Sequence, residues 1–103
     1  MKVVIDEAAQ HEMQEAALFY ENCREGLGLE FLNAVDFGLN QVRLHPNTWR
    51  KLKGRFRRYL LNRFPYALIY TIEDDTVYVA AIMHLKRKPG YWWDRGKDKE
   101  IKD

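Results

Sequence analysis

Residues 55–84 read RFRRYLLNRFPYALIYTIEDDTVYVAAIMH, and this stretch decides the fold. The pattern becomes alternating at residues 55–61, and two further runs rich in apolar and aromatic residues follow at residues 66–72 and 76–84. Alternation predicts strands, because successive side chains of a strand point to opposite faces of a sheet. Only short connections separate the runs, and the second connection is the acidic turn Glu73-Asp74-Asp75. We therefore expect an antiparallel three-stranded meander.

The two faces of this meander are expected to differ. On the third run, alternation predicts one apolar face that carries Val77, Val79, Ala81 and Met83. We expect helices to cover that face and the opposite face to stay open. The side chains predicted on the open face are Arg57, Tyr59, Tyr70, Tyr78 and His84. A register slip of one residue would exchange the two faces, so the sequence alone leaves this assignment open.

Two amphipathic helices precede the meander. Val3-Val4-Ile5 is a short β-branched strand, and Asp6 and Glu7 follow it where acidic residues favour a helix start. An apolar stripe with steps of three and four then predicts a helix over residues 7–24, through Ala9, Met13, Ala16, Tyr20 and Cys23. Beyond the Gly26 break, a second stripe predicts a helix that ends before Pro46, through Phe31, Leu32, Val35, Leu39 and Val42. The predicted fold is α+β, in the order β-α-α-β-β-β, with a helical hairpin packed on a mainly antiparallel sheet.

Length and composition predict one domain in a reducing compartment. The 103 residues suffice for a single domain, which we place at residues 1–95, and we expect the charged residues 96–103 to form a frayed C-terminal tail. Cys23 is the only cysteine, so no internal disulfide forms, and we expect its side chain to be buried. The three histidines lie far apart, and we predict neither a metal site nor a cofactor. No stretch is apolar enough for a signal peptide or a membrane span, and we expect a cytoplasmic protein.

Charge is distributed very unevenly along the chain. Residues 1–42 carry eight acidic and two basic side chains, whereas residues 43–103 carry fifteen basic and seven acidic ones. Between Asp36 and Glu73 there are eight bases and no acid. A block of one sign is typical of a surface that meets a polyanion or an acidic partner. The alternative is a solvated surface on which the bases gather by chance.

Several short motifs in the meander and after it carry a family resemblance. They are Arg57-Arg58-Tyr59, Arg63-Phe64-Pro65-Tyr66, Ile69-Tyr70, Ala80-Ala81-Ile82-Met83-His84 and Arg87-Lys88-Pro89-Gly90-Tyr91-Trp92. Over residues 3–95 the chain resembles the RelE/ParE superfamily of toxins from bacterial type II toxin–antitoxin systems, in its plasmid-stabilisation, ParE-like branch. The resemblance implies a small growth inhibitor that a cognate antitoxin neutralises, with an acidic, partly disordered antitoxin segment wrapped around the toxin.

The resemblance leaves three mechanisms open. RelE-like members bind the decoding site of the ribosome and cut messenger RNA. ParE-like members block DNA gyrase and need no catalytic residue. The third alternative is a partner-binding relic that has lost its toxicity.

For RNA cleavage, His84 and Arg57 are the predicted catalytic residues. The resemblance places His84 where some RelE-like ribonucleases carry a strand-end histidine, and histidine can act as acid or base near neutral pH. The planar guanidinium of Arg57 suits a phosphate. The structural interpretation of His84 is instead a strand-end side chain bonded to the tail. The predicted nucleic-acid or target-binding residues are Lys51, Lys53, Arg55, Arg58, Tyr59, Tyr70, Arg87, Tyr91 and Trp92. Of Trp92 and Trp93, we expect one to anchor a partner and the other to close the core.

Overall fold

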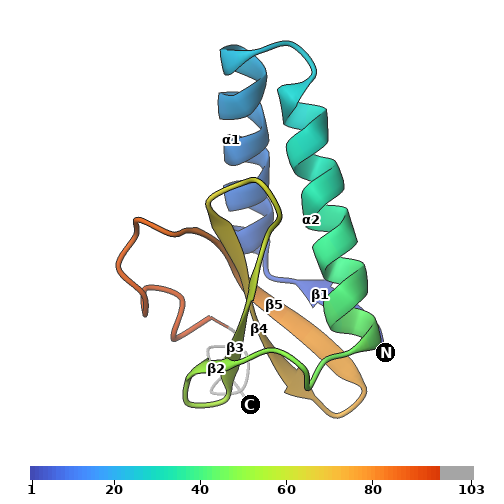
Figure 1. Cartoon of the computed structure of the whole chain (residues 1–103). Coiled ribbons are helices and arrows are strands. Elements are labelled where there is room, and N and C mark those ends of the chain that lie inside the picture. The colour runs from blue at the N-terminus through green and yellow to red at the C-terminus, as the bar shows by residue number, and fades with distance from the viewer. Residues whose placement is uncertain (96–103) are drawn as a thin grey trace.

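The computed structural model describes residues 1–95 and confirms the predicted α+β fold, in which two helices pack on a mainly antiparallel sheet (Figure 1). The predicted C-terminal tail, residues 96–103, lies outside the described residues. The elements are β1 (Lys2–Ile5), α1 (Glu7–Cys23), α2 (Leu27–Leu44), β2 (Lys51–Lys53), β3 (Phe56–Leu60), β4 (Tyr66–Glu73) and β5 (Thr76–His84). The sequence did not predict β2, which lies within the basic segment before the meander.

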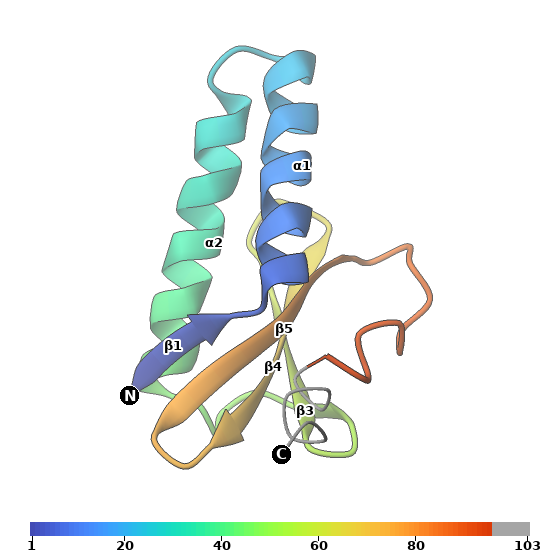
Figure 2. The same ribbon diagram turned by 180° about the vertical axis from the view of Figure 1, so that it is seen from behind.

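The sheet has the order β1-β5-β4-β3-β2. The strands β2 to β5 pair as antiparallel neighbours, as the meander predicts, whereas β1 pairs in parallel with β5. The first and last strands of the described chain are therefore side by side, and the turned view shows β1 alongside β5 (Figure 2). This order leaves β1 and β2 as the two edge strands of the sheet.

The helices α1 and α2 form a hairpin that extends beyond the sheet (Figure 1), and its first helix starts at an N-cap residue. Asp6 is the N-cap of α1, and its carboxylate accepts a hydrogen bond from the Ala8 N–H at 2.9 Å. Gly26 is the N-cap of α2, and its φ of 88° is a left-handed conformation that favours glycine. Cys23 lies at the far end of α1, where no strand covers the helix, and it is exposed. The predicted burial of Cys23 is therefore wrong.

One hydrophobic core fills the space between the helices and the sheet. Phe31, Val35 and Val42 of α2 are buried there with Ala9 and Ala16 of α1. The sheet contributes Tyr59, Leu68, Tyr70, Val77, Val79 and Ile82 to the same core. Tyr59 and Tyr70 were predicted on an open face, so that part of the prediction is wrong.

A bulge in β5 explains why the face assignment fails. Ile69 pairs with Ala81 but the next residue, Tyr70, pairs with Val79, so Ala80 is an extra residue in β5. Ala80 and Ala81 consequently both belong to the core on the face opposite the helices. Alternation is reversed beyond this point, so Met83 and Val79, which were predicted to share a face, lie on opposite faces of the sheet.

The face opposite the helices is not open either. Residues 85–95 fold back across it, and Trp92 is fully buried in a second core with Phe56, Ala67, Ile69, Tyr78, Ala80, Ala81 and Met83. An edge-to-face contact between the Trp92 and Phe56 rings, with centroids 4.7 Å apart, holds this cover against the sheet. The sheet is thus enclosed by the hairpin on one side and by the C-terminal segment on the other.

Candidate functional site

The structure does not bring the predicted catalytic residues together. Arg57 pairs with Tyr70 of β4, whereas His84 pairs with Tyr66 of the same strand. Four residues of strand separate these two positions, which corresponds to roughly 13 Å along the sheet. Arg57 is bonded to the segment before β2 and His84 to the segment after β5, so the two side chains do not form one site in this structure.

Arg57 and Tyr70 both fasten the segment that leads into β2. The Arg57 guanidinium donates hydrogen bonds to the Trp49 carbonyl at 2.7 Å and to the Asn47 carbonyl at 3.3 Å. The Tyr70 hydroxyl donates to the Pro46 carbonyl at 2.7 Å. Burial raises the pKa of Tyr70 to about 12. Both residues therefore have local structural partners in the positions where we predicted ligand contacts.

His84 lies at the rim of a hollow beside α1. Its ring packs against Tyr66, with 4.9 Å between centroids, and its Nδ1 accepts a hydrogen bond from the Lys86 N–H at 3.0 Å. The hollow has a volume of about 290 Å³, and its other lining residues include Glu12, Phe19 and Arg87. His84 is thus bonded to the segment after β5, as its structural interpretation predicts, and it also faces a carboxylate and a guanidinium.

Glu12 is the residue in this region that sequence reasoning missed, since it is not a member of the apolar stripe that predicts the first helix. Its carboxylate accepts hydrogen bonds from the Ile82 N–H at 3.0 Å and from Arg95 at 3.1 and 3.2 Å. Arg87 lies 3.5 Å from the same carboxylate. The spacing of Glu12 to the buried Ala9 and Ala16, three and four residues away, was the available signal, because such residues share a helix face.

The predicted aromatic ligands are mostly occupied within the fold. Tyr59, Tyr70 and Trp92 are buried, at 7%, 0% and 0% exposure, so their rings are not presented to a partner. Tyr91 is half-buried and lies 3.5 Å, centroid to guanidinium, from Arg87. Trp93 is half-buried, with the Lys53 ammonium 5.3 Å from its ring. Trp92 is the tryptophan that closes the core.

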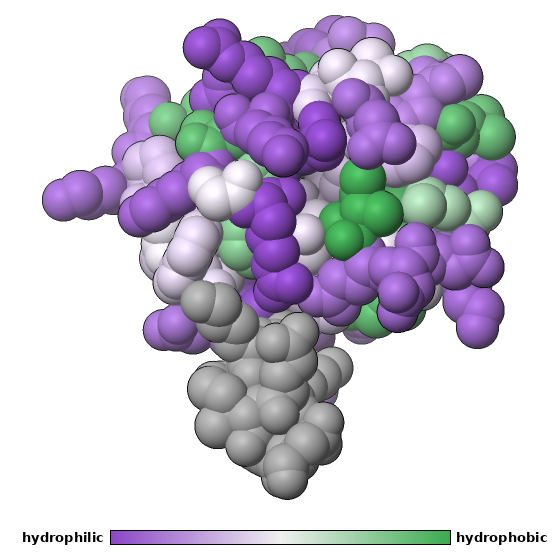
Figure 3. Space-filling view, turned by 90° about the horizontal axis from the view of Figure 1, so that it is seen from below, coloured by the Kyte–Doolittle hydropathy of each residue, from purple (hydrophilic) through white to green (hydrophobic). Residues whose placement is uncertain are grey.

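The basic block divides into paired and unpaired side chains. Arg55 forms an ion pair with Glu73 and Arg63 forms one with Glu30, each at 2.8 Å. Within residues 1–95, no ion pair forms at Arg50, Lys51, Lys53 or Arg58. Arg50, Lys51 and Arg58 line one hollow of about 250 Å³ with Leu52, at the β2 edge of the sheet. The view from below shows a mainly hydrophilic surface at this end of the molecule (Figure 3).

The sequence matches a known protein family over most of its length. The family described as the ParE toxin of the type II toxin–antitoxin system, parDE, matches residues 3–89. The chain belongs to the ParE toxin family. The predicted superfamily is therefore confirmed, and membership implies that the toxin has a cognate antitoxin. No curated protein matches the chain at a significant level.

The described residues of the toxin contain neither a membrane-spanning helix nor a cluster of metal ligands. In the part of the chain that the structure describes, neither helix combines the length and hydropathy that crossing a membrane requires. Across residues 1–95, no three His, Cys, Asp or Glu side chains gather in a way that could hold a metal ion.

Proposed function

We propose that this toxin inhibits growth by binding DNA gyrase, without any chemistry of its own, and that the basic hollow at the β2 edge contacts the target. The observation that carries the proposal is the group of cations Arg50, Lys51 and Arg58 around one hollow, none of which forms an ion pair within residues 1–95. Surface bases with no acidic neighbour create a positive potential that attracts an acidic surface. A binding mechanism needs such a surface and no catalytic group.

The arrangement of His84 and Arg57 supports binding over cleavage. Cleavage by a 2′-hydroxyl requires a base, an acid and a cation around one phosphate. Arg57 lies about four strand residues from the His84 position and donates to two backbone carbonyls. Membership of the ParE family supports the same mechanism, because the ParE-like branch is the one whose resemblance implies gyrase inhibition.

The test is a supercoiling assay with purified gyrase and purified toxin. We expect Lys51→Ala combined with Arg58→Ala to weaken inhibition by about tenfold or more, which corresponds to roughly 1.4 kcal/mol of binding free energy. Arg63→Ala is the matched control, because it removes one base of the same block that is already paired with Glu30. Unchanged inhibition in the double variant would place the contact elsewhere, and no inhibition by the unsubstituted toxin would refute the gyrase proposal.

One observation favours a second candidate function, ribosome-dependent cleavage of messenger RNA. His84, Glu12, Tyr66 and Arg87 all line the hollow beside α1, so an acid–base group, a carboxylate and a cation border the same space. Under this alternative, induced expression produces new transcript 5′ ends within translated codons, and His84→Gln abolishes them. Growth arrest with intact transcripts, unaffected by His84→Gln, supports the gyrase proposal instead. Normal growth with the unsubstituted chain would indicate a relic.

We also propose that the antitoxin lays an acidic segment on the basic hollow. The same three unpaired cations support this assignment. The expected result is antitoxin affinity that falls with added salt, and falls less steeply in the Lys51→Ala and Arg58→Ala double variant. An equal salt dependence in the two proteins would contradict it.

A further inference from the structure

Within residues 1–95, the edge strand β1 has a row of outward-facing backbone groups that no other strand pairs with. The Lys2 N–H donates to the Asp75 carbonyl at 3.0 Å, and the Asp6 N–H donates to the Val79 carbonyl at 2.9 Å. Backbone groups alternate in direction along a strand, so the N–H and C=O groups of Val3 and Ile5 point away from β5. The Gln10 side chain covers only the Ile5 carbonyl, through an exposed hydrogen bond of 3.2 Å. The rest of this edge can accept another strand.

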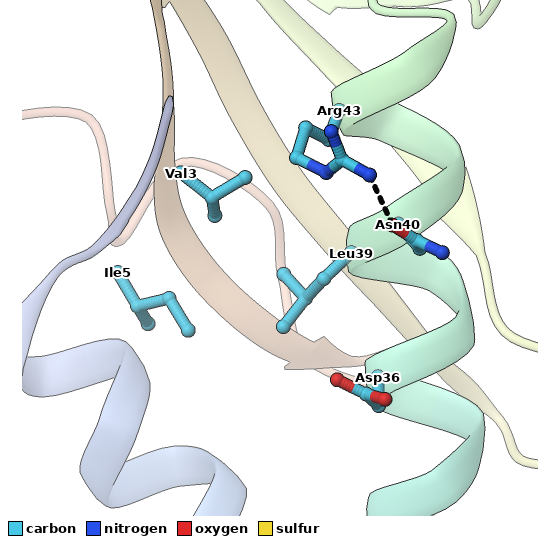
Figure 4. Close-up of a pocket in the computed structure, with 6 residues that line it drawn as sticks. All are labelled: Val3, Ile5, Asp36, Leu39, Asn40 and Arg43. Atoms are coloured by element: carbon cyan, nitrogen blue, oxygen red, sulfur yellow. Dashed lines mark hydrogen bonds between the residues drawn. The ribbon is translucent and has the colours of Figure 1, made fainter. Parts of the chain in front are cut away.

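A hollow adjoins this edge on the side of the helices. It has a volume of about 400 Å³ and lies between β1 and the second half of α2. Val3, Ile5 and Leu39 are its apolar lining, and Asp36, Asn40 and Arg43 are its polar lining. In the close-up, Val3 lies toward the Arg43 end and Ile5 toward the Asp36 end (Figure 4).

Charge along this surface changes sign from one end to the other. Arg43 lies at the Val3 end of the hollow (Figure 4), and Lys2 precedes Val3 in the strand. Asp36 lies at the Ile5 end of the hollow (Figure 4), whereas the Asp6 carboxylate, which follows Ile5, already accepts hydrogen bonds from the Ala8 N–H and the Tyr78 hydroxyl. A surface with one basic end and one acidic end is complementary to itself after rotation by 180°. A peptide that carries charges of one sign only would be repelled by like charge at one of the two ends.

We infer that β1 pairs with β1 of a second copy of this chain, antiparallel and about a two-fold axis at Val4. Val3 then faces Ile5 of the other copy, and their outward N–H and C=O groups form backbone hydrogen bonds in both halves of the pair. The exposed Val4 side chain, at 43%, packs against its own symmetry mate. The sheet becomes continuous through both copies.

The same rotation brings the two α2 helices into antiparallel opposition. Asp36 of one copy faces Arg43 of the other, and Leu39 and Asn40 lie near the axis, since they are central in the hollow. Pairing requires the Ile5 carbonyl to exchange its bond with Gln10 for one to the second copy. That exchange costs little, because the bond with Gln10 is exposed to water.

The experiment measures the mass of the purified full-length toxin by sedimentation across a concentration series. We expect a monomer–dimer equilibrium. Asp36→Arg sets a new guanidinium against Arg43 of the other copy, and Arg43→Asp sets a new carboxylate against Asp36. Each single variant is therefore expected to weaken the dimer by about tenfold, and the combined variant to regain most of that loss. Glu25→Arg, at the tip of the hairpin, is the matched charge reversal and should leave the dimer unchanged.

Two outcomes would overturn this inference. The first is a monomer at every concentration, with circular dichroism showing that the protein is folded. The second is a dimer in which the combined variant associates no better than either single variant, because the two charges would then not face each other. If the edge instead takes a strand of the antitoxin, the toxin alone is monomeric and the charge reversals change antitoxin affinity. Neither measurement depends on gyrase, so the proposed function can fail while the dimer stands.

Discussion

The two faces of the sheet are covered in different ways. On one face, α1 and α2 bury a core with residues that repeat at helical spacing, and their backbones are hydrogen-bonded within each helix. On the other face, residues 85–95 contain neither helix nor strand, and Trp92 supplies the one fully buried side chain of that segment. Periodicity makes a helical cover recognisable from sequence, whereas an irregular cover depends on a few side chains. The irregular cover should therefore be the easier one to remove by a single substitution.

The largest effect is expected for Trp92→Ala. Its ring is fully buried, and removing a ring of this size from a core typically costs about 3–5 kcal/mol of unfolding free energy. Urea denaturation measures the loss. Trp93→Ala is the control in the same segment, because that ring is only half-buried, and it should cost clearly less. Equal losses in the two variants would show that Trp92 is not the principal attachment of this cover.

A smaller loss is expected for Gly38→Ala on the helical side. A Cβ at Gly38 would lie 2.7 Å from Cε1 of Tyr59 and 3.1 Å from Cδ1 of Leu68, so α2 would have to move away from the sheet. Overpacking of this kind costs roughly 1–3 kcal/mol. The exposed Asn33→Ala, on the same helix, is the control and should leave the urea midpoint nearly unchanged. A stabilised Gly38→Ala variant would show that the hairpin is packed less tightly than the structure implies.

Glu12→Gln tests the link between the two covers, because Glu12 belongs to α1 and binds Arg95 of the C-terminal segment. The amide keeps an acceptor for the Ile82 N–H but loses the charge that holds the guanidinium. The expected loss is roughly 1 kcal/mol, and it should shrink when Arg95→Gln is already present. Additive losses in a double-mutant cycle would indicate that the two side chains are not coupled.

The last prediction concerns the pH dependence of stability that Tyr70 causes, which is absent at neutral pH. Its pKa is raised by burial from 10.0 to about 12, so the folded protein holds this proton where the unfolded chain has released it. Stability is therefore unaffected below pH 10 and falls as the pH rises from 10 toward 12. Unfolding free energies across that window measure the slope. Tyr70→Phe should reduce the slope but not abolish it, because burial also raises the pKa of Tyr78 and of Tyr91. An unchanged slope would assign the pH dependence to these other groups.

Much of the fold follows from patterns in the sequence. The structure has its last strand at Thr76–His84, as the alternation predicts, and both helices lie within a few residues of their apolar stripes. β2 escaped prediction, because three residues are too few to show alternation. The bulge at Ala80 left no signal, since every residue from Val77 to Met83 is buried and apolar or aromatic. One unrecognised residue then reversed the predicted face of His84.

The candidate site was less predictable than the fold. Charge counting identified the basic block, but only the structure separates Arg55 and Arg63, which are paired, from Arg50, Lys51 and Arg58. Residue type alone cannot distinguish an aromatic ligand from an aromatic core residue, and Tyr59 and Tyr70 proved to be core. Glu12 meets Arg95 only because the chain returns across the sheet, and such long-range contacts leave no local pattern.

The pairing of β1 with β5 has a consequence for how the toxin is made. Lys2 lies opposite Thr76, so the first strand has no partner until the last strand of the sheet has been synthesised. A domain emerging from the ribosome can build only the contacts whose two partners are already present. The hairpin can therefore form early, but the β1 edge and the closed sheet are completed only after residue 84. A product released before that point lacks the finished sheet on which every proposed binding surface depends.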